Sequence, residues 1–103
     1  KPWVARRALL SSLGDADIRL LRVFVVVAEC RGIAASELEL NIGKSTISKY
    51  ISDLEHRIGL RICNRGPAGF SLTSEGEQVL NLANGLLAQI DEFQSRLHSI
   101  QKT

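Results

Sequence analysis

The stretch from Lys44 to Ile58 carries two kinds of side chain at helical spacing. The apolar ones recur in steps of four, three and four and therefore share one side of a helix; they are Ile47, Ile51, Leu54 and Ile58. Roughly opposite lie Ser45, Ser48, Lys49, Ser52 and His56, with Lys44 in the first turn. Lys can donate to guanine O6 and N7, Ser can bond base edges or phosphates, and short side chains let a helix approach a groove floor. An ordinary solvated helix face has a similar composition, so this face alone leaves both interpretations open.

The residues after this stretch predict a β-hairpin. Leu60–Cys63 and Phe70–Leu72 alternate apolar and other residues on either side of the turn signal at Gly66–Gly69. Arg61 and Arg65 are expected at or near the tip, where a cation could contact phosphates or enter a minor groove. A hairpin with merely solvated arginines would show the same pattern.

Two segments before Lys44 are expected to position the polar face of the Lys44–Ile58 helix. Asp15 and Asp17 can cap a helix that ends near Gly32. Its helical stripe is expected to be Ile18, Leu21, Val25 and Ala28. The β-branched run at 25–27 favours a buried strand instead, but the length of about 14 residues favours a helix.

A second, short helix is predicted over Ile33–Leu40, and the turn Asn41–Gly43 separates it from Lys44. Two helices around a short turn containing Gly form a helix-turn-helix, whose second helix can enter a major groove. A hairpin that follows such a unit is called a wing.

The last segment predicts a long helix that begins with Thr73 or Ser74 as its cap, and Ser74 with Glu77 has the spacing of a capping box. Its apolar residues alternate in steps of four and three: Val79, Ala83, Leu86, Ile90, Phe93, Leu97 and Ile100. Such a seam usually pairs with a partner helix, here expected to be a second copy, although it could instead pack on the chain's own core. The turn signal Asn84-Gly85 could break the helix, but the unbroken register on both sides favours continuity.

Composition narrows the function classes. The 103 residues carry 13 Lys and Arg against 11 Asp and Glu, and positive charge is concentrated in residues 1–22 and 44–66. The longest apolar run, at 23–28, is far shorter than the roughly 20 residues of a membrane span. Two cysteines without a disulfide framework favour a reduced, cytoplasmic setting, and a start at Lys1 suggests a fragment of a longer chain.

Catalysis finds little support. His56 and His98 have no Asp or Cys at triad or metal-ligand spacing, and no Gly-rich phosphate loop occurs. We therefore expect no enzyme activity, no cofactor and no metal. Cys63 is interpreted as a small buried apolar residue, because nothing in the sequence near it would activate a thiolate.

From Asp17 through Gly76, the sequence resembles the N-terminal winged helix-turn-helix domain of LysR-type bacterial transcription regulators. The matching motifs stand at 24–29, 45–51 and 54–62, and they continue through Arg65, Gly66, Leu72-Thr73 and Glu75-Gly76. The resemblance implies that Lys44, Ser45, Ser48 and Lys49 reach bases and phosphates, with Thr46 assisting, and that Arg65 reaches DNA from the wing. It also implies a dimer on a pseudo-palindromic site and, in full-length members, a further domain that binds a small-molecule effector.

We therefore predict a mainly α fold: a winged helix-turn-helix with a three-helix core and a two-stranded wing, followed by a long linker and dimerisation helix. The expected divisions are an N-terminal extension at 1–14, the DNA-binding domain at 15–73 and the helix at 74–103. The expected DNA-contacting set is Lys44, Ser45, Thr46, Ser48, Lys49, Ser52, Arg61 and Arg65. The alternative is a coiled-coil interaction module that binds protein rather than DNA. The expected location is the cytoplasm, at the nucleoid.

Overall fold

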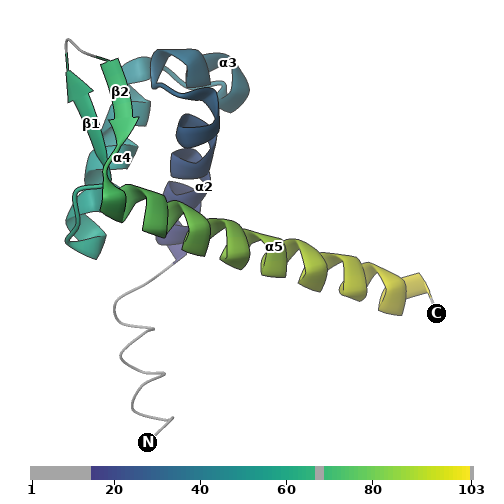
Figure 1. The fold of residues 1–103 in the computed structure, drawn as a ribbon. Helices are drawn as coiled ribbons and strands as arrows, with labels where there is room; N and C mark the ends of the chain where they lie inside the picture. Colours follow the sequence, from purple (N-terminus) through teal and green to yellow (C-terminus); the bar gives the residue numbers. More distant parts are fainter. Residues whose placement is uncertain (1–14, 67–68, 103) are drawn as a thin grey trace, which may run out of the picture.

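The computed structural model describes residues 15–66 and 69–102. In chain order its elements are helix α2 (Asp15–Cys30), the 3-10 turn η1 (Ala34–Ser36), helices α3 (Glu37–Leu40) and α4 (Lys44–Ile58), strands β1 (Cys63–Gly66) and β2 (Gly69–Leu72), and helix α5 (Ser74–Lys102) (Figure 1). This is the predicted winged helix-turn-helix followed by a long helix. The expected extension at 1–14 lies outside the described residues. No described helix is long and apolar enough to span a membrane.

Helix α2 is helical, as its length predicted, but its buried face differs from the expected stripe. Of the expected stripe only Val25 is buried, whereas Ile18, Leu21 and Ala28 are half-buried. The core side of the helix is instead formed by Leu20, Val23, Phe24 and Val27. The run of consecutive apolar residues in this helix fits more than one helical face, so periodicity alone could not select the right one. The left-handed residue after the helix is Arg31 (φ 61°), one position before the predicted Gly32.

Asp17 lies in the first turn of α2, which begins at Asp15. Its carboxylate is almost fully buried and accepts two hydrogen bonds from Arg57, at 3.1 Å from Nε and 2.9 Å from Nη2. These hydrogen bonds, and secondly the charge of Asp17, raise the pKa of Arg57. The two-pronged pair holds the C-terminal turn of α4 against the beginning of α2.

Helix α4 has the predicted bounds. Ile47, Ile51 and Leu54 are buried in contact with the α2 core residues, and Ile58 packs at the edge. At its end Gly59 adopts φ +71° and donates its N–H to the Glu55 carbonyl at 2.9 Å, a left-handed cap that favours Gly.

The start of α4 is capped from another helix. Gly43 occupies the N-cap position and has no side chain to offer, but a carboxylate oxygen of Glu37, in α3, accepts the Lys44 N–H at 2.9 Å. The turn between the helices holds Asn41 in the left-handed region at φ 56°. Glu37 therefore joins the two helices of the helix-turn-helix directly, in the place of a local cap.

The wing is shorter at its base than predicted. Its first strand begins at Cys63 rather than Leu60, and the antiparallel register pairs Cys63 with Leu72 and Arg65 with Phe70. The Ile62 N–H is bonded to the Glu55 carboxylate and the Ile62 carbonyl to the Thr73 N–H, so this residue docks the hairpin instead of entering the ladder. The predicted turn residues Pro67 and Ala68 lie outside the described residues.

Thr73 caps α5. Its Oγ1 accepts the Gly76 N–H at 2.9 Å and donates to the Arg61 carbonyl at 2.6 Å. Ser74 lies inside the helix and its hydroxyl contacts Glu75, so the capping box suggested by Ser74 and Glu77 does not form. The helix continues through Asn84-Gly85 to Lys102, as the register predicted.

The seam of α5 is divided between two environments. Ala83 is buried and Val79 packs against the chain's own core, whereas Leu86, Phe93, Leu97 and Ile100 are exposed. Figure 1 shows the C-terminal half of α5 extending beyond the other elements. Packing against the core of the same chain therefore accounts for the first turns of α5 only.

Gly76 marks the closest contact between α5 and the wing. It is buried, and a methyl group on its Cα would overlap the carbonyl of Ile62. We expect Gly76→Ala to lower the free energy of unfolding by about 1–3 kcal/mol, because backbone must move to admit the methyl group. Urea denaturation followed by circular dichroism measures this.

Gly85 provides the matched control in the same helix, because its Cα faces open space. Gly85→Ala should stabilise the protein by about 0.5–1 kcal/mol through helix propensity alone. Equal effects of the two substitutions would contradict the close approach at Gly76.

The Glu37 cap also has a measurable consequence. Glu37→Ala should lower the free energy of unfolding by about 0.5–2 kcal/mol, the range for losing a helix cap. Glu37→Gln keeps a carbonyl oxygen that can accept the Lys44 N–H, so most of the stability should return. A loss as large in the Gln variant as in the Ala variant would show that the cap is not the cause.

Candidate nucleic-acid interface

The face of α4 opposite its buried stripe is open to solvent. Lys44, Ser45, Thr46, Lys49 and Ser52 are exposed, and Ser48 is half-buried beside the wing. Burial of Ile47, Ile51 and Leu54 fixes this orientation, since the helix cannot rotate without exposing them. The structure thus brings the predicted polar residues of the helix together on one surface.

Lys49 pairs with Asp53 one turn later in the helix, with 3.2 Å between Nζ and Oδ2. The two side chains are 71% and 45% exposed, and an ion pair so open to water contributes little to stability. Lys49 can therefore exchange this carboxylate for another anion at small cost.

Arg65 lies in β1 and its guanidinium turns back onto α4. Nη1 donates to the carbonyl of Ser48 at 3.3 Å and to its Oγ at 3.1 Å. Nη2 donates to Ser52 Oγ at 3.3 Å and lies 3.5 Å from Glu55 Oε1. Arg65 is therefore part of a junction between wing and helix, which the sequence placed only near the hairpin tip.

Arg61 is not at the tip, contrary to the prediction. It precedes β1 at the opposite end of the hairpin, where its carbonyl accepts the Thr73 hydroxyl. Its side chain is exposed. The strand extends from Cys63 to Gly66 and the tip follows Gly66, so Arg61 lies before the ladder and far from the turn.

Glu55 is the site residue that sequence reasoning missed. One carboxylate oxygen accepts the N–H groups of Ile62 at 2.9 Å and Cys63 at 3.4 Å, and the other faces Arg65. The signal available was its position within the 54–62 motif: it directly follows an apolar residue of the α4 stripe and stands eight positions before the hairpin.

Cys63 is buried, as its interpretation as a small apolar residue requires. Burial raises the pKa of its thiol, and the nearby Arg65 guanidinium offsets this only in part. The thiol is therefore protonated at neutral pH and unsuited to nucleophilic chemistry. Within 15–66 and 69–102, no group of three His, Cys, Asp or Glu side chains could hold a metal ion.

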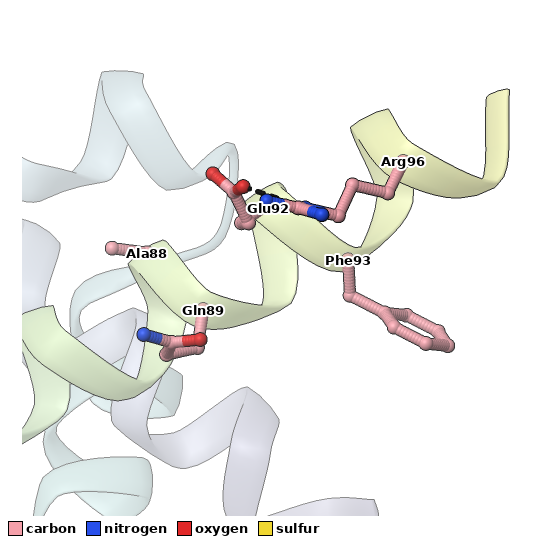
Figure 2. A pocket seen from close by; sticks show the side chains of 5 residues that line it. All are labelled: Ala88, Gln89, Glu92, Phe93 and Arg96. Atoms are coloured by element: carbon pink, nitrogen blue, oxygen red, sulfur yellow. Dashed lines mark hydrogen bonds and ion pairs between the residues drawn. The ribbon is translucent and has the colours of Figure 1, made fainter. Parts of the chain in front are cut away.

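The exposed half of α5 carries an apolar stripe. Leu82, absent from the predicted seam, is 75% exposed and shares one helical face with the exposed residues of that seam: Leu86, Phe93, Leu97 and Ile100. Figure 2 shows the ring of Phe93 pointing away from the helix, beside a shallow hollow that Ala88, Gln89, Glu92 and Arg96 also line. An ion pair of 2.8 Å between Glu92 and Arg96 borders the hollow.

Residues 18–77 match the family described as bacterial regulatory helix-turn-helix protein, lysR family. The chain is 40% identical over 98 residues to the HTH-type transcriptional activator BauR of Pseudomonas aeruginosa, covering 95% of this chain and 32% of BauR. It is 31% identical over 87 residues to the HTH-type transcriptional regulator MetR of Escherichia coli, covering 84% of this chain and 27% of MetR. The chain thus spans about a third or less of these relatives.

Solved structures agree with the sequence matches. The BenM DBD in complex with catB site 1 DNA superposes with a TM-score of 0.79 at 29% identity, covering 84% of this chain and 97% of that one. The CbnR DBD in complex with DNA superposes with a TM-score of 0.76 at 26% identity, covering 81% and 95%. The resemblance read from the motifs is confirmed: the chain belongs to the lysR family of bacterial regulatory helix-turn-helix proteins.

Proposed function

We propose that this chain binds a specific double-stranded DNA sequence, with α4 in the major groove and the wing on the backbone or in a minor groove. The observation that carries the proposal is the solvent-facing surface of α4, which combines two lysines with short hydroxyl side chains. The BenM and CbnR domains, which share this fold, are solved as complexes with DNA.

The proposed contacts have different roles. Lys44 and Lys49 supply positive charge for phosphates or a purine edge, and Ser45, Thr46, Ser48 and Ser52 supply hydrogen bonds at short range. Arg65 lies where wing and helix meet. Arg61, at the base of the wing, is proposed as a phosphate contact because its side chain is exposed.

Removing one lysine at a time tests the electrostatic contribution of α4 to DNA binding. Lys44→Ala and Lys49→Ala should each weaken binding to a randomised duplex pool and reduce the slope of log K against log salt by about 0.9, the loss of one phosphate contact. Fluorescence anisotropy at 50 mM and 200 mM salt measures both quantities.

The control is Lys102→Ala, which removes the same charge at the far end of α5. It should leave affinity and slope nearly unchanged. If all three variants lose affinity alike, only net charge matters and α4 has no special role. If the folded wild-type chain binds no duplex even at 50 mM salt, the proposal is wrong.

We further propose that two copies pair through α5. The stripe from Leu82 to Ile100 spans about 27 Å of helix and leaves large apolar side chains in water, with Phe93 63% exposed. Val79 and Ala83, which the sequence assigned to the dimer, already pack within their own chain. The proposed interface is therefore Leu82, Leu86, Ile90, Phe93, Leu97 and Ile100, and Val79 and Ala83 act beneath it by fixing the helix on the domain.

A symmetric dimer would present two α4 helices to a pseudo-palindromic site, with half-sites one DNA turn of about 34 Å, or a multiple of it, apart. Since the chain spans about a third of BauR, we propose that it is the DNA-binding part of a longer regulator that acts in the cytoplasm at the nucleoid. In that longer regulator, a separate domain would bind a small-molecule effector.

A charge in the stripe should separate the dimer. Phe93→Glu is expected to raise the dimer dissociation constant by roughly 30-fold or more, as for a central interface residue. Sedimentation equilibrium over a concentration series measures the constant.

Ser95→Glu adds the same charge on the opposite, exposed face of the helix and should leave the constant unchanged. If the two variants dissociate alike, the stripe is not the interface, and a monomeric wild-type chain at all concentrations would sink the dimer proposal.

A further inference from the structure

The junction between wing and helix contains more hydrogen bonds than docking the hairpin requires. Glu55 already holds the base of the wing through the Ile62 and Cys63 N–H groups. Arg65 adds four contacts to α4, which use four of the five N–H donors of its guanidinium. A group so fully engaged has little left to offer a phosphate, so its role has to be sought in what it does to its partners.

The first effect of Arg65 is on the hydroxyl of Ser52. In a helix, Ser commonly turns its hydroxyl back to the carbonyl four residues earlier, here that of Ser48. That carbonyl already accepts the Ser52 N–H within α4 and the Arg65 Nη1 at 3.3 Å, which fills both of its lone pairs. The back-bond is therefore blocked.

The second effect of Arg65 is on the direction in which the Ser48 and Ser52 hydroxyl groups point their hydrogens. Ser48 Oγ and Ser52 Oγ both accept N–H groups of Arg65, at 3.1 Å and 3.3 Å. A hydroxyl that accepts from one side directs its own O–H elsewhere, and Ser52 is exposed on the face proposed for DNA. The Ser52 O–H is thereby left for an acceptor outside the protein, and Ser48, half-buried one helical turn earlier, accepts from the same guanidinium.

Resting on the proposed function, we propose that Arg65, oriented by Glu55, is a positioning residue that fixes Ser48 and Ser52 as hydrogen-bond donors. This part of the interface then directs O–H groups toward acceptor atoms of DNA. The acceptors available are purine N7, guanine O6 and thymine O4 in the major groove, and phosphate oxygens along the backbone.

A double-mutant cycle on a duplex selected from the randomised pool tests the coupling. Arg65→Ala and the pair Ser48→Ala/Ser52→Ala should each lower affinity by about 5- to 10-fold or more. Together they should cost little more than the serine pair alone, because Arg65 acts through the hydroxyls. The salt slope should stay unchanged in Arg65→Ala. Additive losses, or a slope reduced by about 0.9, would show Arg65 contacting phosphate itself and overturn the inference.

Glu55→Gln separates positioning from simple charge. Its carbonyl oxygen can still accept the Ile62 and Cys63 N–H groups, so the wing stays docked, while its amide group meets Arg65 with donors. We expect a loss of affinity close to that of Arg65→Ala, with the thermal midpoint lowered only slightly by the loss of the charged acceptor. Removing a carboxylate near DNA should otherwise tighten binding, so tighter binding by this variant would also overturn the inference.

Ser52→Thr and modified DNA complete the test. Threonine keeps the hydroxyl and should restore most of the affinity that Ser52→Ala loses. In the selected duplex, 7-deazapurine substitution identifies a purine N7 acceptor, and methylphosphonate substitution identifies a phosphate. At the position that Ser52 contacts, the substituted duplex should bind the wild type more weakly than the unmodified duplex does. Ser52→Ala should bind the two duplexes equally well. Failure of the wild type to bind any duplex would refute the proposed function and this inference with it, whereas binding without coupling refutes the inference alone.

Discussion

The packing of α4 on α2 is the contact on which the rest of the structure depends. Phe24 and Val27 of α2 are fully buried together with Ile47 and Ile51 of α4. Side chains of this kind contribute about 1.5–3 kcal/mol each when buried, so no rotation of α4 that exposes them is accessible. The apolar stripe thus determines which residues of α4 are exposed to solvent, and these residues form the polar face.

The wing inherits its position from this contact. Two strands of four residues have little stability alone, so they need anchoring on other elements. Glu55 provides it from the border between the buried and polar faces of α4, and Ile62 and Cys63 are buried beside it. One carboxylate therefore ties the hairpin to the helix and orients Arg65, which explains why a single residue influences both the fold and the candidate interface.

Sequence periodicity predicted what is local. The bounds of α4, its stripe, and the continuity of α5 follow from spacing and from caps such as Gly59. It could not show partners that lie far along the chain: Asp17 was read only as a possible cap, and its ion-pair partner Arg57 is 40 residues away. Glu37 and Glu55 accept backbone N–H groups only seven or eight residues away, but those groups lie across a turn, so helical periodicity does not show the pairing.

The seam of α5 shows how one pattern can combine two overlapping faces. Val79 and Ala83 face the core, while Leu86 lies on a neighbouring exposed face together with Leu82, and the predicted heptad register runs from Val79 through Leu86 without separating the two faces. Burial of the first turns fixes the rotation of α5 about its own axis. The direction of its exposed face is therefore set within the single chain, without a partner.

The start of α5 is fixed equally firmly. Thr73 bonds the Arg61 carbonyl and caps the helix, and Gly76 lies against the Ile62 carbonyl. The wing and α5 are therefore joined by close contacts at Thr73 and Gly76. In the proposed dimer, a rotation of one α5 against the other would move the attached wing and, through Glu55, the recognition face of α4. The spacing of the two recognition helices would then be set by packing within each chain as much as by the dimer interface itself.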